Sequence, residues 1–297
     1  MKIINVLIIL AIIVGMNACN EDEIFEREQY KTVFALVSED GYNVFRVVHD
    51  LEEPESVGYI AVSMGGTRPT EHPVEIIIAP DMDAFERYNV SNFDVDFSNY
   101  ARLVPNYIID DYKLTVAAGE RSGRMPVRVK PDGLSPDSTY FIPLKIEDYD
   151  QYEANPNKSN VLYQVLMKNR YATTEAITNY TMIAYRDGTM FPGVKTMHPI
   201  SRNKVRIMVD NLPFQADIDE INKFAIVLEI TNDNNVIITP YEDINVEQID
   251  GDAQFPNIFR IEDEGFRKFK VFLLRYNYWD GAIRLEMKEE LRLEFIE

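Results

Sequence analysis

The sequence predicts an all-β protein with two domains, an N-terminal β-sandwich and a C-terminal antiparallel β-domain. Short runs rich in β-branched and aromatic residues recur from residue 31 onward, and clusters of Gly, Pro, Asp and Asn separate them. About eight such runs precede residue 168, which is enough for a sandwich. A second set begins near Tyr180. The chain of 297 residues is long enough to bury the core of two ordinary domains.

The first domain is expected over residues 30–168. One short helix of a turn or two is expected at residues 81–88, between strands. Residues 169–174 break the strand pattern and form the expected linker. The expected strands of this domain are 31–37, 43–49, 57–64, 74–79, 112–116, 125–129, 139–146 and 161–168.

The second domain is expected over residues 175–297, as an antiparallel meander. Its clearest strand is 283–295, where six of the seven odd positions are apolar and all six even positions are charged. This period of two indicates a strand, because a helix would scatter the apolar residues around its axis. Glu289 is the polar exception, and it is expected to mark a bulge or bend. The meander could close as a small calycin-like barrel or form a second sandwich.

The charge balance bounds the possible partners. If residues 1–18 are removed, Lys2 is lost, and 29 basic residues face 49 acidic ones, a net charge of −20. Nucleic-acid affinity depends largely on Lys and Arg, so a nucleic-acid partner is excluded as the default. The same charge disfavours binding of the protein surface to anionic membranes. The single cysteine, Cys19, leaves the body without a disulfide.

The N-terminus has the pattern of an export signal. Lys2 precedes an apolar run at residues 3–16, which is short for a membrane-spanning helix but suits a signal peptide. Ala18-Cys19 resembles the lipobox of bacterial lipoproteins, in which the cysteine is lipidated and becomes the mature N-terminus. The resemblance implies a signal peptide over residues 1–18 and lipidation of Cys19. The alternative is a membrane-anchoring helix with an incidental cysteine.

An acidic stretch follows the lipobox, and residues 19–29 form the expected tether. It resembles the export signal with which Bacteroidetes-type bacteria send lipoproteins to the outer cell surface. The implied location is the outer membrane, facing the cell exterior, with the lipid anchor as the contact to the membrane. The alternative is a solvated linker that keeps the body clear of the lipid headgroups.

Four short motifs occur in order within the first domain. Together they resemble the immunoglobulin-like N-terminal domain, of formerly unknown function, found in Bacteroidetes surface lipoproteins from polysaccharide-utilisation loci. The resemblance covers roughly residues 30–168. The motifs are Tyr88-Asn89 after a short helix, Leu103-Val104-Pro105-Asn106-Tyr107, Ala118-Gly119 in a hairpin, and Tyr140-Phe141-Ile142-Pro143-Leu144-Lys145-Ile146.

The second domain resembles the partner domain that often follows this one. The similar residues are Leu274, Tyr276, Tyr278, Glu290 and Leu291. The implied relatives are SusE/SusF-like lipoproteins, which bind glycan at the cell surface without catalysis and assist a SusC/SusD-type importer. The resemblance therefore implies an oligo- or polysaccharide ligand and an outer-membrane importer as partners. The second possibility is a surface interaction, scaffold or adhesin-type protein with no direct glycan binding, and the third is a glycan-processing enzyme.

The sequence offers little catalytic chemistry. The three histidines, His49, His72 and His198, lack metal-ligand spacing, and no phosphate-binding loop or nucleophile motif occurs. We therefore predict no catalytic residue, no metal and no cofactor. Carboxylates are abundant, but a glycosidase pair must lie about 5–10 Å apart across a cleft, which spacing in sequence does not define.

The predicted ligand-binding segment is Tyr276-Asn277-Tyr278-Trp279-Asp280. It combines aromatic planes, on which sugar rings pack, with an amide and an acid that bind hydroxyl groups. The competing interpretation is that Tyr276 and Tyr278 line the core and that Trp279 covers the end of the domain. A second candidate loop contains Tyr185, and a third candidate group comprises Asn92, Phe93, Tyr100 and Tyr107.

Overall fold

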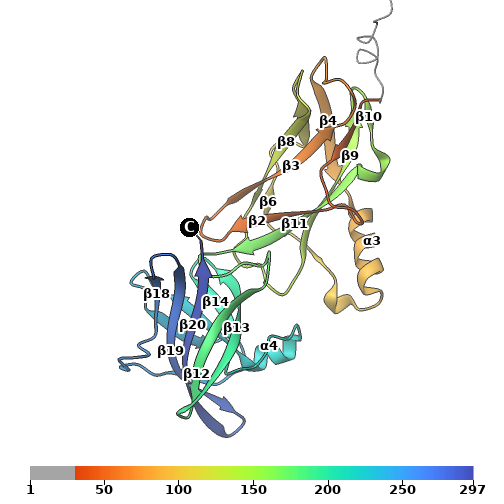
Figure 1. Cartoon of the computed structure of the whole chain (residues 1–297). Helices are drawn as coiled ribbons and strands as arrows, with labels where there is room; N and C mark the ends of the chain where they lie inside the picture. The colour runs from red at the N-terminus through yellow and green to blue at the C-terminus, as the bar shows by residue number, and fades with distance from the viewer. Residues whose placement is uncertain (1–30, 297) are drawn as a thin grey trace, which may run out of the picture.

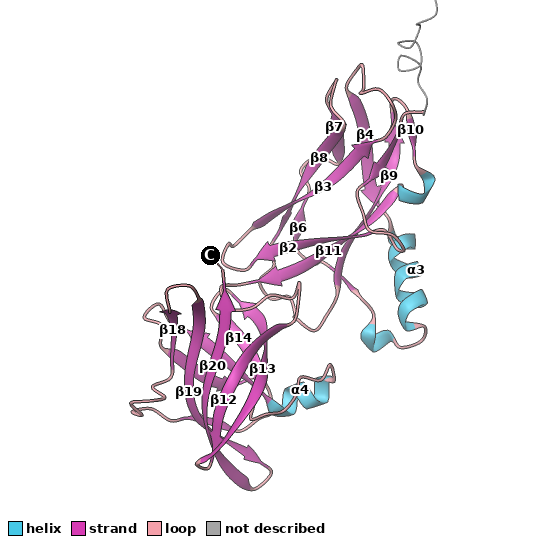
Figure 2. Ribbon diagram, viewed as in Figure 1, coloured by secondary structure: helices cyan, strands magenta, loops and turns pink. Residues whose placement is uncertain are grey.

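The computed structural model describes residues 31–296, and β-strands dominate this range (Figures 1 and 2). Two sheets form the N-terminal part, and one large sheet forms a nearly closed barrel in the C-terminal part. The predicted all-β class is thereby confirmed. The predicted signal peptide 1–18, the lipidation site Cys19 and the tether 19–29 lie outside the described residues. No helix within residues 31–296 is both long enough and apolar enough to span a membrane.

The two N-terminal sheets enclose one core. The first has the strand order β10-β1-β3-β8-β6, and the second has the order β2-β11-β9-β4-β7 with β5 beside β9. Their strands are β1 (Val33–Leu36), β2 (Val44–Asp50), β3 (Ser56–Met64), β4 (Val74–Pro80), β5 (Arg102–Leu103), β6 (Tyr107–Ile108), β7 (Lys113–Val116), β8 (Ser122–Val129), β9 (Tyr140–Tyr149), β10 (Glu153–Ala154) and β11 (Asn160–Lys168).

Alternation along the strands builds the core of the sandwich. Every second residue of β3, namely Ile60, Val62 and Met64, is at most 4% exposed, since successive side chains point to opposite faces. Gly58 continues this inward face. A Cβ at Gly58 would collide with the hydroxyl of the fully buried Tyr163, so glycine leaves room for that ring.

Helix α3 (Met82–Phe93) packs beside the sandwich (Figure 2). Asp81 caps its N-terminus by accepting a hydrogen bond from the backbone N–H of Ala84 at 3.3 Å. The prediction of one or two turns was too short, because tertiary contacts extend the helix. Buried Asn89 exchanges hydrogen bonds with the backbone of Ala101, at 2.8 and 3.3 Å, which holds the second half of the helix in place.

The C-terminal sheet has the order β16-β15-β14-β13-β12-β20-β19-β17, with β18 also paired to β19. The backbone N–H of Val236 donates to the carbonyl of Asn257, and that of Phe259 donates to the carbonyl of Asn234, both at 2.8 Å, so β16 meets β18 and nearly closes a barrel. The elements are β12 (Thr178–Arg186), β13 (Thr189–Ser201), β14 (Lys204–Met208), α4 (Ile218–Phe224), β15 (Ala225–Ile230), β16 (Val236–Pro240), β17 (Val246–Gln248), β18 (Ile258–Asp263), β19 (Lys268–Asp280) and β20 (Ile283–Phe295).

Strand β20 has the bounds that its alternation predicted, but the interpretation of Glu289 was wrong. Glu289 pairs with Leu274 of β19 and with Ala184 of β12 in uninterrupted register, so no bulge occurs there. Its side chain points inward and is fully buried. A cation from β13, Lys195, makes this burial possible by forming an ion pair with Glu289.

The sandwich and the barrel lie end to end in Figure 1, and β10, with its partner β1, lies at the end of the sandwich away from the barrel. Asn169 lies between the two parts, where its amide donates to the carbonyl oxygens of Ser201 and Lys204 at 2.8 and 3.1 Å. An ion pair also joins them directly, from Arg206 of β14 to Asp137 in the loop before β9. The junction is therefore fixed by specific polar contacts.

Candidate functional site

Tyr276 of the predicted segment belongs to the barrel interior. Its side chain is fully buried, and its hydroxyl donates to Glu289 at 2.9 Å. Glu289 in turn pairs with the ammonium group of Lys195 at 3.0 Å. Burial raises the pKa of both Glu289 and Tyr276, so the Tyr276 hydroxyl remains a protonated donor at neutral pH. The Tyr276 ring therefore offers no surface to a sugar.

Tyr278 also points inward and is 4% exposed. Its hydroxyl donates to Asp210 at 2.7 Å, and Asp210 also accepts from Arg186 at 2.6 Å. Burial opposes ionisation of Asp210, but the hydrogen bonds from Arg186 and Tyr278 outweigh it and lower the pKa of this carboxyl. Tyr276 and Tyr278 thus line the core, as the competing interpretation of the segment stated.

The other three residues of the segment lie outside the barrel interior. Asn277 is 1% exposed, because β17 covers it and its amide donates to Glu247 at 3.1 Å. Trp279 is partly exposed near the end of β19, and Asp280 is exposed at the turn into β20. The predicted segment is therefore divided between core and surface, and it forms no continuous aromatic platform.

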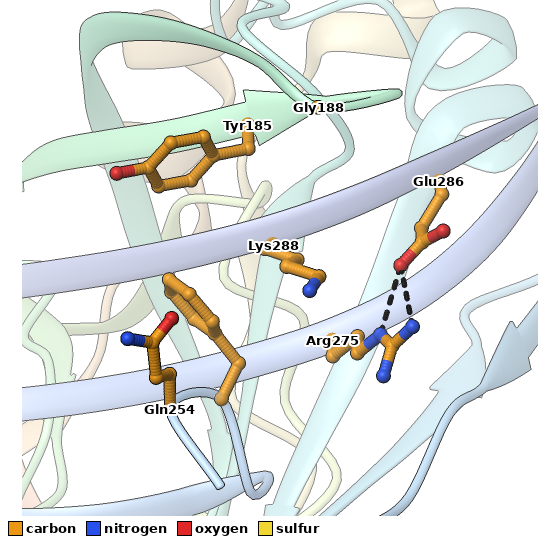
Figure 3. Close-up of a pocket in the computed structure, with 7 residues that line it drawn as sticks. Tyr185, Gly188, Gln254, Arg275, Glu286 and Lys288 are labelled. Carbon is orange, nitrogen blue, oxygen red and sulfur yellow. Dashed lines mark hydrogen bonds and ion pairs between the residues drawn. The ribbon is translucent and has the colours of Figure 1, made fainter. Parts of the chain in front are cut away.

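Tyr185, by contrast, lies in a pocket of about 360 Å³ on the outer face of the barrel (Figure 3). The rings of Tyr185 and Phe255 meet edge to face, with centroids 6.0 Å apart. Gln254 lies across the pocket from Tyr185 (Figure 3). Aromatic rings beside an amide suit a sugar, whose C–H face packs on a ring while its hydroxyls bind polar groups. The lining residues are Tyr185, Gly188, Gln254, Phe255, Arg275, Glu286 and Lys288.

Strand register assembles the floor of this pocket. Tyr185 of β12 pairs with Lys288 of β20, which pairs with Arg275 of β19. Directly opposed residues of antiparallel strands lie on one face, so these three side chains form a row on the outside of the sheet. Three strands of a rigid barrel therefore position the row.

The charges of the floor neutralise one another. Asp252 accepts a hydrogen bond from Lys288 at 2.7 Å and lies 3.2 Å from Arg275, which also pairs with Glu286 at 2.8 Å. The hydrogen bond from Lys288 lowers the pKa of Asp252 to about 2, so this carboxylate stays ionised at physiological pH. Two cations and two anions leave the floor without net charge.

One wall of the pocket comes from the loop between β17 and β18, which sequence reasoning missed. The carboxylate of Asp252 accepts hydrogen bonds from the backbone N–H groups of Gln254 and Phe255, at 2.8 and 3.2 Å. Asn257 anchors the end of the loop by donating to the carbonyl of Ile249 at 2.8 Å. The loop has no periodicity, and the single available signal was the turn-forming potential of Asp252.

The third candidate group is only partly assembled. The rings of Phe93 and Tyr100 lie 6.2 Å apart beside the 3₁₀ helix η1 (Phe97–Asn99). Asn92, on α3, donates to the carbonyl of Tyr88 within the same helix. Tyr107 lies in β6 and packs against the sandwich core.

The histidines are dispersed through the fold. His49 is buried in the sandwich, where Nε2 lies 2.9 Å from the hydroxyl of Tyr163. His72 is exposed, and His198 packs on the ring of Phe214 with centroids 4.3 Å apart. Within residues 31–296, no group of three His, Cys, Asp or Glu side chains is arranged to hold a metal ion.

Two family models match the sequence in tandem. A model described as an N-terminal domain matches residues 29–153, and one described as a C-terminal domain matches residues 159–292. No curated protein matches the chain.

Several solved structures share the fold at low sequence identity. A Bacteroides ovatus protein of unknown function has a TM-score of 0.66 at 14% identity, covering 89% of this chain and 95% of that one. A B. ovatus multidomain protein including DUF1735 has a TM-score of 0.64 at 15% identity, covering 90% and 95%. An auxiliary nutrient binding protein from Bacteroides thetaiotaomicron has a TM-score of 0.60 at 14% identity, covering 84% and 90%. The chain therefore has the two-part all-β fold found in these Bacteroides proteins.

Proposed function

We propose that the protein is a non-catalytic, lipid-anchored surface protein that binds glycan and assists a SusC/SusD-type importer of the outer membrane. The observation that carries this proposal is the pocket of Tyr185, Phe255 and Gln254, which joins an aromatic pair to an amide on a rigid sheet. The pocket volume of about 360 Å³ lies near the lower end of the range of about 300–1,000 Å³ for small-molecule sites. A pocket of this size on the outer face of the barrel suits one sugar unit of a longer chain.

The charge of the site favours a neutral glycan. The two cations of the floor, Lys288 and Arg275, are already paired with Asp252 and Glu286. An acidic sugar would have to displace these pairs and approach a chain of net charge −19. Hydroxyl groups can share the same donors and acceptors without breaking the pairs.

Two further observations support the cellular part of the proposal. The apolar run at 3–16 followed by Ala18-Cys19 and an acidic tether fits a surface lipoprotein. A protein of the same fold carries the description auxiliary nutrient binding protein. Labelling of whole cells with a fatty-acid analogue tests the anchor, since the label should be incorporated by the natural protein and lost in Cys19→Ala.

A glycan-binding screen tests the site. The detergent-solubilised full chain is measured by affinity gel and calorimetry against plant, host and microbial polysaccharides. Tyr185→Ala is expected to weaken binding by between about fivefold and about 150-fold, if packing of a sugar ring is worth as much as stacking of a nucleic-acid base on an aromatic ring, on the order of 1–3 kcal/mol. Trp279→Ala serves as the matched aromatic control outside the pocket. Loss of binding in Trp279→Ala alone would move the site to the end of β19.

A surface interaction protein is the second candidate function. Three apolar side chains on the outer face of β12 and β13, Ile183, Met190 and Val194, are 48%, 62% and 55% exposed. Exposed apolar patches of this kind often mark protein contacts. Absence of binding across the polysaccharide panel, together with importer capture that fails in Met190→Glu, would favour this function over glycan binding.

A further inference from the structure

A groove lies between the sandwich and the barrel. It has a volume of about 850 Å³, more than twice that of the pocket at Tyr185. The sandwich wall follows η1 and the loop before β9, and the barrel wall is α4 with the segment before it; these walls face each other in Figure 2. The residues that matter here are Ser98, Arg102 and Asp137 on the sandwich side and Gln215, Asp217 and Ile218 on the barrel side.

The two walls are held in a fixed relation by a buried ion pair. The guanidinium of Arg206 binds Asp137 in a two-pronged arrangement, with N–O distances of 2.5 and 2.6 Å. The Arg206 side chain is 1% exposed and lies between the rings of Tyr241 and Phe214, 5.0 and 5.8 Å from their centroids. Planar two-pronged pairs fix orientation as well as distance. The groove is therefore a preformed shape that needs little rearrangement to accept a ligand.

Each wall presents an uncommitted polar side chain with several hydrogen-bonding groups. Among residues 31–296, the guanidinium of Arg102 and the side-chain amide of Gln215 make no hydrogen bond or ion pair. The acids of the groove are already satisfied, because Arg206 neutralises Asp137 and the carboxylate of Asp217 accepts from the first N–H groups of α4. The free groups are hydrogen-bond donors and an amide acceptor, which match hydroxyl groups.

An exposed aromatic residue precedes the first lining residue of the sandwich wall. Phe97, which immediately precedes Ser98, is 73% exposed, and its ring packs on that of Tyr100 with centroids 5.1 Å apart. A sugar ring could pack on this face while neighbouring hydroxyls reach Arg102. An aromatic ring together with hydrogen-bonding side chains is also what the Tyr185 pocket offers, there from other strands and loops.

We propose that the groove between the sandwich and the barrel is a second glycan-binding site, which takes a longer stretch of a neutral, polyhydroxylated chain than the Tyr185 pocket does. The ligand class rests on the proposed function, whereas the location rests on the groove alone. The volume of about 850 Å³ falls near the upper end of the range for ligand sites, and such sites occur preferentially at domain interfaces.

Hydrogen exchange of the full chain with a neutral oligosaccharide from a bound polysaccharide tests this inference. We expect slower exchange on binding in residues 96–103 and 211–221, in addition to residues 249–257 at the Tyr185 pocket. Arg102→Ala with Gln215→Ala should abolish the first two effects and weaken binding about tenfold, while protection at 249–257 persists. Tyr185→Ala should show the reverse pattern.

The outcomes separate the two proposals. Protection confined to residues 249–257, with unchanged affinity in the Arg102→Ala/Gln215→Ala protein, would overturn the groove site and leave the proposed function intact. Protection confined to the groove would support the second site and remove the first. Binding of no neutral oligosaccharide would overturn both. Circular dichroism of each variant shows that a loss of binding is not a loss of fold, because both substituted residues are exposed.

Discussion

Lys195 and Glu289 form an ion pair inside the barrel, with 3.0 Å between Nζ and Oε1 and only 1% and 0% of their side chains exposed. Lys195 also donates to the carbonyl oxygen of Met208 at 2.8 Å. A charge in such a position is tolerable only with its partner, because desolvation costs several kcal/mol per ion.

Removal of Lys195 alone should therefore damage the barrel strongly. We expect Lys195→Met to lower the free energy of unfolding by about 3–5 kcal/mol, because Glu289 remains buried without a cation. Urea titration measures the loss. The double variant Lys195→Met/Glu289→Leu should recover most of it, since neither charge remains. An equal loss in both variants would show that packing, not the unpaired charge, is the cause.

The contact between the sandwich and the barrel can be tested in the same way. Asp137→Asn should cost about 3 kcal/mol, because it leaves the buried guanidinium of Arg206 without an anion. Small-angle scattering should then show a broader range of separations between the two parts. Glu39→Gln is the matched control: its pair with Arg46 is more than half exposed and should contribute less than about 1 kcal/mol.

Acid should destabilise the sandwich through His49. Burial lowers the pKa of His49 from 6.5 to about 4, so the unfolded chain takes up the proton first as the pH falls. The contribution of neutral His49 to the free energy of unfolding is fully present above about pH 6.5. It decreases between pH 6.5 and 4, by up to about 3 kcal/mol. Burial lowers the pKa of His198, in β13 of the barrel, to about 4 as well, so acid should also destabilise the barrel.

Thermal unfolding between pH 4 and 7 measures this effect. His49→Gln should flatten the dependence on pH, whereas the exposed control His72→Gln should leave it unchanged. A slope that is the same in the natural protein and in His49→Gln would assign the acid sensitivity to other groups.

Gly58 should tolerate no side chain. In Gly58→Ala the new Cβ would meet the Tyr163 hydroxyl and lie 2.8 Å from Val47 Cγ1, which we expect to cost about 1–3 kcal/mol by overpacking. Gly65→Ala is the control, because the nearest atom to its Cβ lies 3.5 Å away. Adding Tyr163→Phe to Gly58→Ala should recover part of the loss in a urea titration, since it removes the colliding oxygen.

The bounds of the strands were easier to predict from the sequence than the partners of buried polar side chains. Period-two alternation located β20 from Ile283 to Phe295 without error, because one face of that strand is buried and the other is solvated. The same rule led to the wrong expectation of a bulge at Glu289. Alternation predicts which face of a strand is buried, but it cannot show that Lys195, 94 residues away, supplies a cation. Helix α3 was predicted too short, because Asn89 acts through a contact with Ala101.

The Tyr185 pocket could be predicted from the sequence only in part. Tyr185 was among the predicted residues, but Phe255 and Gln254 lie in an irregular loop that joins it only through the barrel fold. No local pattern marks two residues as neighbours when 70 positions separate Tyr185 from Phe255. The roles of Trp279, Asn277 and Asp280 in binding stay predictions.

The end-to-end arrangement of sandwich and barrel has a mechanical consequence. Because β1 begins at the end of the sandwich away from the barrel, tension between residue 31 and a ligand held on the barrel passes along the whole length of the molecule (Figure 1). The linker, with the two hydrogen bonds of its Asn169 amide, and the Arg206–Asp137 pair join the two parts, whereas each part is held by long ladders of hydrogen bonds. Under a pull the ion pair should yield first, so the barrel would swivel toward the direction of the force while both parts stay folded.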